Sequence, residues 1–249
     1  MIELTTERFA GIECLHAAPA GQRQQRLPTV VFYHGFTSSK EVYAYFAVAL
    51  AQAGFRALMP DADMHGARYN GDADTRFTHF WDILKQNIDE FPLIETALRA
   101  DDLIAGERLA VAGASMGGMT ALGIMARYPH IHSVACMMGS GYFMQLSQTL
   151  FPPVTVTSEE QKALFTKRMA PLAEYDPSSR LPNLANRPLL LWHGEADEVV
   201  PFAEAQRLDR ALREQGLDAH LITLSEKHIG HKITPSGLTA LVSFFKRQL

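Results

Sequence analysis

The sequence predicts a single α/β domain spanning residues 1–249, with a mostly parallel central sheet and helices on both faces. Short continuous apolar runs alternate along the chain with segments whose apolar residues recur at helical spacing. The runs at 29–33, 109–112 and 189–193 have no polar face, which is typical of strands buried on both sides. A chain of 249 residues that is 47% hydrophobic can bury a large core and has the natural size of one α/β domain.

The first half of the chain supplies the N-terminal strands and the long helix of this plan. Apolar and polar residues alternate weakly over 1–17, which predicts one or two edge strands around Gly11. Pro and Gly residues mark a polar loop over 18–28. In order, the next predicted elements are a strand at 29–33, a helix at 41–53, a strand at 55–59, and a long helix at 76–99 with a bend near Phe91-Pro92.

The second half continues the alternation, with one interruption. A strand at 108–112, a helix at 119–128 and a strand at 132–138 are followed by residues 142–187, which break the rhythm. We interpret 142–187 as an insertion containing a short helix at 158–169. The alternation then resumes with a strand at 189–193, a helix at 202–215, a strand at 219–224, a loop at 225–232 and a final helix at 235–249.

Composition limits the classes of partner. The formal charge of −4 and the pI near 6.2 give no electrostatic reason to expect binding to nucleic acid or to an anionic membrane. No segment has the length and apolarity of a transmembrane helix, and the acidic N-terminus lacks the apolar core of a signal peptide. Two cysteines, Cys14 and Cys136, do not make a disulfide framework. We therefore expect a cytoplasmic protein, whose oligomeric state, monomer or homodimer, the sequence leaves open.

The strand at 108–112 ends in a pattern typical of a catalytic nucleophile. Gly113, Ser115 and Gly117 form G-x-S-x-G between a strand and a helix, which is the nucleophile-elbow arrangement. The turn must hold Ser115 in a strained conformation so that its hydroxyl projects above the sheet edge, and the flanking residues must be tiny. The first N–H of the following helix, on Met116, would then point at the group that Ser115 attacks.

Three further polar residues follow predicted strands. His34, Asp197 and His231 each come just after an apolar run, as Ser115 does. Ligands of parallel α/β sheets bind at the carboxyl ends of the strands, so these side chains should share one edge. A serine nucleophile needs a base to take its proton and an acid to orient that base. From the residues alone, the base could be His228 or His231, and the acid could be Asp197 or a neighbouring glutamate, Glu195 or Glu198.

With serine, aspartate and histidine in that order, the chain resembles the α/β-hydrolase superfamily over nearly its whole length. More closely, it is similar to the bacterial YjfP-type esterases. The motifs that carry the resemblance are His34-Gly35-Phe36-Thr37, Gly113 to Gly117, Trp192 to Pro201, and Gly230-His231.

The resemblance implies a carboxylesterase active on short-chain esters, without implying a physiological substrate. It assigns Ser115 as nucleophile, His231 as base and Asp197 as the acid that orients it. It also implies an oxyanion hole made by the backbone N–H groups of Phe36 and Met116. A serine peptidase, a thioesterase and a non-catalytic ligand-binding relative are the alternatives.

Neither a cofactor nor a metal ion is expected. Asp61, Asp63 and His65 alternate as metal ligands can, but no further His or Cys nearby completes a usual ligand set. His34, Gly35, Tyr142 and Phe143 are predicted to line the pocket for a small ester substrate. Residues 142–187 are predicted to form a small helical cap over Ser115, and the alternative is a surface insertion that packs only on itself.

Overall fold

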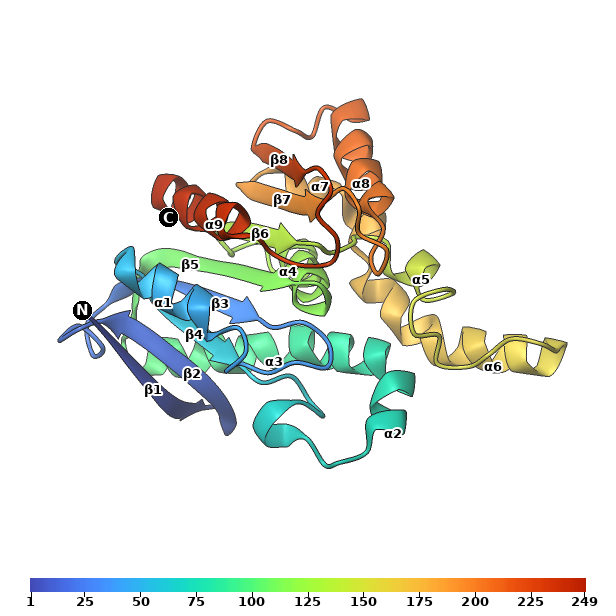
Figure 1. Ribbon diagram of the computed structural model, residues 1–249, viewed down its shortest axis with the longest axis horizontal. Coiled ribbons are helices and arrows are strands. Elements are labelled where there is room, and N and C mark those ends of the chain that lie inside the picture. Colours follow the sequence, from blue (N-terminus) through green and yellow to red (C-terminus); the bar gives the residue numbers. More distant parts are fainter.

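The computed structural model describes all 249 residues and is built on one eight-stranded sheet with the order β1-β2-β4-β3-β5-β6-β7-β8 (Figure 1). All pairs from β4 to β8 are parallel, whereas β1 pairs antiparallel with β2, and β2 with β4. The strands are β1 Ile2–Phe9, β2 Ile12–Pro19, β3 Leu27–Tyr33, β4 Arg56–Pro60, β5 Ile104–Ala114, β6 Ser133–Met137, β7 Leu189–Gly194 and β8 Leu221–Glu226.

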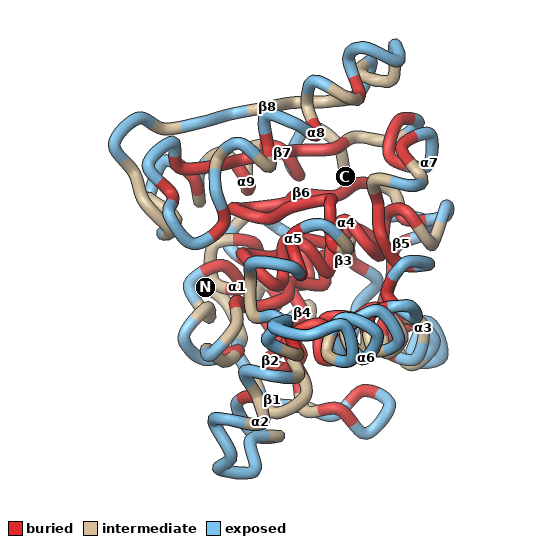
Figure 2. The backbone as a smooth tube through the Cα atoms, turned by 90° about the vertical axis from the view of Figure 1, so that its right-hand side faces the viewer, coloured by how far each residue is buried: buried red, intermediate tan, exposed pale blue.

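Two hydrophobic cores form because the central strands are apolar on both faces. In β3, Val30 and Phe32 point into one core, whereas Val31 and Tyr33 point into the other. The first core is closed by α1 (Ala44–Gln52) and α9 (Pro235–Gln248). The second is closed by α3 (Phe80–Ala100), α4 (Met116–Arg127) and α8 (Phe202–Glu214). Figure 2 shows the buried central strands and α4 between the exposed outer helices. The predicted fold class is therefore confirmed.

The long helix differs from its prediction. It does not begin at residue 76 but is divided at His79 into α2 (Ala73–Thr78) and α3, and α3 continues through Pro92. Proline has no N–H to give to the carbonyl of Ile88 four residues earlier. The hydroxyl of Tyr128 donates to that carbonyl instead, at 3.2 Å, so the helix can continue. No helix combines the length and apolarity that crossing a membrane requires.

Residues 142–187 are mostly helical and pack on the body of the protein. The segment contains α5 (Phe143–Leu146), α6 (Glu159–Met169), α7 (Pro182–Ala185) and the 3-10 turns η2 (Ala170–Tyr175) and η3 (Pro177–Arg180), whereas a third 3-10 turn, η1 (Gly66–Arg68), lies after β4. Three bonds join the segment to α3: Trp81 donates its indole N–H to the carbonyl of Leu150 at 3.0 Å, Arg168 donates to Asp82 at 3.1 Å, and the Tyr175 hydroxyl donates to Asp89 at 2.7 Å. These bonds contradict the alternative that the insertion packs only on itself.

Candidate active site

Ser115 lies in the sharp turn between β5 and α4. Its φ of 57° and ψ of −117° fall in a region that non-glycine residues rarely adopt. Its N–H donates to the carbonyl of Met137 on the neighbouring strand at 2.8 Å. The strained turn is thus held from the side by β6, and it leaves the residue 9% exposed at the carboxyl edge of the sheet.

The glycines around Ser115 are required by close backbone contacts. A Cβ on Gly113 would lie 2.2 Å from the carbonyl oxygen of Gly117, and one on Gly117 would lie 2.0 Å from that of Tyr33. Both distances are far inside van der Waals contact, and the atoms that would have to move belong to the backbone. The tiny residues predicted on either side of Ser115 are therefore explained by the approach of α4 to β3 and β5.

The side chains of Ser115, His231 and Asp197 form one hydrogen-bonded line. The Oγ of Ser115 is 2.8 Å from Nε2 of His231, and Nδ1 of His231 is 2.7 Å from Oδ2 of Asp197. Because a carboxylate can only accept, Nδ1 carries the proton and Nε2 is free to accept from the serine hydroxyl. Three residues separated by up to 116 positions in the sequence are thus aligned for proton transfer.

Asp197 is held as a carboxylate. Its side chain is fully buried, and its Oδ1 accepts the N–H groups of Val199 and Val200 at 2.9 and 3.0 Å. Burial raises the pKa of this carboxyl, but hydrogen bonds from His193 and His231 outweigh burial and hold the pKa well below its ordinary value. The group facing His231 is therefore negatively charged at neutral pH and stabilises a protonated imidazole.

The alternatives for base and acid are not brought to the site. His228 is exposed and lies in a left-handed turn, with a φ of 62°. Glu195 accepts a hydrogen bond from the Ser225 hydroxyl at 2.8 Å, and Glu198 is exposed. Of the candidates considered from sequence, only His231 and Asp197 connect to Ser115.

Main-chain contacts bring the loops of Asp197 and His231 together. The N–H of Ala196 donates to the carbonyl of Ile229 at 2.9 Å, and that of Glu195 donates to Glu226 at the same distance. A Cβ on Gly194 would lie 2.4 Å from the Ile229 carbonyl oxygen, so only glycine allows this approach. The position of His231 therefore depends on backbone fit at the end of β7.

The two N–H groups predicted to form an oxyanion hole lie next to Ser115, that of Phe36 on the loop after β3 and that of Met116 at the start of α4. An ideal Cβ on Gly35 would be 3.6 Å from the Cβ of Ser115, which places the loop after β3 against the elbow. The N–H of Phe36, the next residue, makes no hydrogen bond within the chain. Met119 is the first residue of α4 whose N–H donates to the elbow, at the carbonyl of Ser115. The N–H of Met116 therefore lies at the N-terminal end of the helix, where N–H groups have no partner within the helix.

Two residues predicted to line the pocket are instead internal. His34 is 1% exposed: its Nδ1 lies 2.8 Å from the carbonyl of Gly35, and its Nε2 accepts the N–H of Ala62 at 3.1 Å. Phe143 has no exposed surface and packs in the core against Trp81. Because a side chain without accessible surface cannot touch a substrate, these two predictions are corrected. Tyr142 is 7% exposed, and the guanidinium of Arg207 stacks on its ring.

Sequence analysis missed an aromatic cluster around the Phe36 side chain. The ring centroid of Phe36 lies 4.9 Å from that of Phe80, 5.0 Å from Phe151 and 5.4 Å from Phe77. These rings come from α2, α3 and the insertion, so helical or strand periodicity within one segment could not reveal their meeting. They bring residues 142–187 into contact with the loop that carries the Phe36 N–H.

The residues that alternate after β4 bind one another and the backbone. Asp61 is buried, and its Oδ2 lies 2.5 Å from Nζ of Lys40 and accepts the N–H of Ala67 at 2.9 Å. His65 also binds backbone groups through both ring nitrogens. The contacts of Asp61 and His65 are thus those of a loop scaffold.

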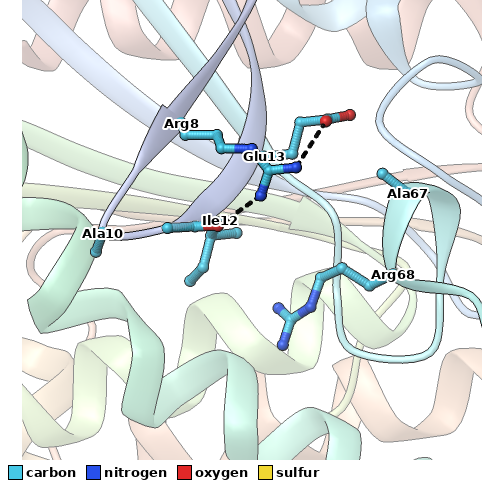
Figure 3. Close-up of a pocket in the computed structure, with 7 residues that line it drawn as sticks. Arg8, Ala10, Ile12, Glu13, Ala67 and Arg68 are labelled. Carbon is cyan, nitrogen blue, oxygen red and sulfur yellow. Dashed lines mark hydrogen bonds and ion pairs between the residues drawn. The ribbon is translucent and has the colours of Figure 1, made fainter.

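A separate hollow lies between the β1–β2 turn and η1 (Figure 3). Its walls include two arginines, each already paired with a carboxylate: Arg8 with Glu13 at 3.4 Å and Arg68 with Glu90 at 2.8 Å. Since neither guanidinium is free to bind an added anion, we assign no ligand to this hollow. None of its lining residues belongs to the predicted catalytic set.

The chain is similar to several known proteins. Residues 84–249 match the model of the prolyl oligopeptidase family. The chain is 50% identical to esterase YjfP of Escherichia coli (strain K12) over the full length of both proteins, and 32% identical to YitV of Bacillus subtilis (strain 168), also over both full lengths. Among solved structures, TT1662 from Thermus thermophilus superposes with a TM-score of 0.77 at 24% identity, covering 99% of this chain and 98% of that one.

Proposed function

Because the chain belongs to the prolyl oligopeptidase family and is a hydrolase of the α/β-hydrolase fold, we propose that it is a serine carboxylesterase acting on small esters. The single observation that carries the proposal is the line from Ser115 Oγ through His231 to Asp197, with distances of 2.8 and 2.7 Å. The 50% identity with an esterase over the full chain supports the same class of bond.

The reaction begins when Ser115 attacks the acyl carbonyl while Nε2 of His231 takes the serine proton. Asp197 stabilises the imidazolium that forms. His231 then gives the proton to the leaving alcohol, and an acyl-enzyme on Ser115 remains. Water then attacks the acyl-enzyme ester while His231 takes its proton; His231 returns that proton to the Ser115 oxygen as the acyl–oxygen bond breaks, and the acid product leaves. A positioned base of this kind contributes on the order of 10²–10⁴-fold in rate.

The oxyanion formed in each step is stabilised by the N–H groups of Phe36 and Met116. Phe36 lies on a loop that adjoins Ser115, Met116 begins α4 directly after it, and the positive end of the α4 dipole acts in the same direction. One such donor typically contributes about 3 kcal/mol to transition-state stabilisation. The arrangement thus supplies a nucleophile, a base and electrostatic stabilisation from four separate loops.

We infer a preference for small acyl groups from the surroundings of Phe36. Its ring is packed among those of Phe77, Phe80 and Phe151. We assign residues 142–187, which contribute Phe151, as a small cap that limits the acyl site. Replacing Phe151 by alanine is expected to shift the preferred p-nitrophenyl ester toward a longer chain, and an unchanged preference contradicts this role.

The nucleophile is tested by covalent labelling. A fluorophosphonate probe should label the wild-type protein at Ser115, and Ser115→Ala should lose both the label and at least about 10³-fold of the esterase rate. An unlabelled wild type indicates a non-catalytic ligand-binding relative. A labelled Ser115→Ala variant indicates a different nucleophile.

The class of substrate is tested by turnover of matched esters, thioesters and amides that share one acyl group. We expect the highest kcat/KM for the oxygen ester with an acetyl or butyryl group. The match to a peptidase family makes amide hydrolysis the leading alternative. A higher kcat/KM for the amide or the thioester would assign the same triad to a peptidase or a thioesterase.

A further inference from the structure

The loop that carries the Phe36 N–H is held by the neighbouring loop after β4. Three backbone N–H groups donate from one loop to a side chain of the other: Ala62 N–H to His34 Nε2 at 3.1 Å, Thr37 N–H to His65 Nε2 at 3.0 Å, and Lys40 N–H to Asp61 Oδ1 at 3.0 Å. The middle bond lies on the residue directly after Phe36. Its acceptor, His65, has no other assigned function.

Thr37 needs an external restraint. Its φ is +60°, a left-handed conformation that is a genuine outlier for a β-branched residue and costs on the order of 1–3 kcal/mol. The turn reverses the chain just after Phe36, and the Thr37 hydroxyl bonds only locally, to the Phe36 carbonyl at 2.7 Å. Relaxation of Thr37 to an ordinary conformation would rotate the peptide planes on either side of Phe36. The strain is therefore stored beside an N–H group whose direction matters for catalysis.

His65 is built to supply this restraint. Its side chain is buried, and its Nδ1 lies 2.7 Å from the carbonyl of Asp63, which requires the proton to be on Nδ1. Nε2 is then an acceptor that is fixed in direction and faces the Thr37 N–H. The ring also packs against Phe36, with 5.2 Å between centroids, and against His34 at 5.3 Å.

We propose that His65 is a positioning residue of the esterase reaction, which holds Thr37 in its left-handed turn and so aims the Phe36 N–H at the oxyanion. This inference rests on the proposed function, because it needs Ser115 to form an oxyanion at that place. His65 does not touch the substrate. Its effect passes through one hydrogen bond, and this separates it from a residue that merely fills space.

Two substitutions separate the hydrogen bond from the packing. His65→Gln places an amide oxygen where Nε2 accepts and removes the ring, whereas His65→Phe keeps an aromatic ring against Phe36 and removes the acceptor. We expect His65→Phe to lower kcat by about 10- to 100-fold with KM for a small neutral ester changed less than about threefold. His65→Gln should keep kcat within about fivefold of wild type.

A transition-state analogue provides the second measurement. An alkylboronic acid forms a tetrahedral adduct with the serine whose oxygen occupies the oxyanion site, so its Ki should rise in His65→Phe by the factor by which kcat falls. The control is His16→Phe. This change removes a buried histidine of β2 that is bonded to Arg56 of β4, away from the site. It should lower the melting temperature without changing kcat or Ki.

The outcomes are distinguishable. The proposal is overturned if His65→Phe keeps kcat and Ki, or if His65→Gln is as impaired as His65→Phe while both melt cooperatively. Failure of the proposed function has a different signature, namely a wild type that is inactive on esters or a Ser115→Ala variant that stays active. If His65→Phe does not fold, His65→Leu takes its place as the variant without an acceptor and should show the same losses in kcat and in boronate affinity. An unchanged kcat and Ki in a folded His65→Leu overturns the proposal.

Discussion

The two sides of the candidate active site are held together in different ways. The oxyanion side comprises the loops at 34–40 and 61–68, and the acid–base side comprises the loops at 195–201 and 227–234. Buried side chains join the two loops of the oxyanion side, through His34, His65 and the ion pair of Lys40 with Asp61. On the acid–base side, apart from the His231–Asp197 bond of the triad itself, main-chain hydrogen bonds and a glycine contact join the loops.

The difference shows where each side is vulnerable. A buried side chain that anchors a loop can be removed, and its loss leaves an unpaired polar partner with a cost in stability. A main-chain contact cannot be removed by substitution, but it can be blocked by an added Cβ. We therefore expect substitutions on the oxyanion side to lower stability, with an added loss of activity at His65, and those on the acid–base side to lower activity in a protein that still folds.

The largest effect on stability is expected from Lys40→Met. This change leaves the buried carboxylate of Asp61 without its cation, and breaking a buried pair in this way typically costs about 3–5 kcal/mol. Denaturant unfolding monitored by circular dichroism measures the free energy of unfolding. The matched control is Lys85→Met, which breaks a partly exposed pair with Asp89 within one helix and should cost less than about 1 kcal/mol. Equal losses in the two variants would contradict the comparison.

An intermediate effect, on activity, is expected from Gly194→Ala. The new Cβ would collide with the carbonyl oxygen of Ile229 and push the His231 loop away from Ser115, so kcat/KM should fall about 10- to 100-fold. Gly230→Ala is the control, since its nearest contact would be an ordinary 3.6 Å to Ala196 and its kcat/KM should stay within about threefold. A Gly194→Ala variant that loses stability but keeps its kcat/KM per folded molecule would contradict the contrast between the two sides.

The smallest effect is a difference in pH dependence between the two sides. Burial lowers the pKa of His65 to about 4, whereas an unfolded histidine titrates near 6.5. Between these pH values the unfolded chain binds a proton that the folded chain does not bind. The contribution of His65 to the free energy of unfolding is therefore full above pH 6.5 and is lost toward pH 4. His65→Phe should therefore lose less free energy of unfolding between pH 7 and pH 4.5 than the wild type.

The acid–base side supplies the control for this measurement. The pKa of Asp197 is depressed in the folded state, so its contribution is full above its ordinary value near 4 and is lost only below it. Asp197→Asn should consequently show the wild-type change in the free energy of unfolding between pH 7 and pH 4.5. A flattened pH dependence in Asp197→Asn and an unchanged one in His65→Phe would reverse the assignment.

Much of the fold was predictable because its signals are local. The apolar runs of β3, β5 and β7 and the helical spacing of α8 and α9 each lie within one short segment. The continuation of α3 through Pro92 was not predictable, because the hydroxyl of Tyr128, distant in sequence, bonds the Ile88 carbonyl that proline leaves unpaired. Phe143 was misplaced for a similar reason: its apolar character fits a pocket wall or a core, and only packing against Trp81 decides between them.

The sequence by itself determined which chemical groups are present, namely a serine between glycines at a strand end and one aspartate and one histidine after later strands. Such groups are encoded by residue type and short spacing, which a chain reveals without folding. The family resemblance already assigned His231 as the base, but only the tertiary structure decided that its Nε2 lies 2.8 Å from Ser115 Oγ and that Nε2 of His65 accepts the Thr37 N–H. Those choices depend on distances between loops far apart in sequence, which are set by how the strands pair and how closely their backbones approach.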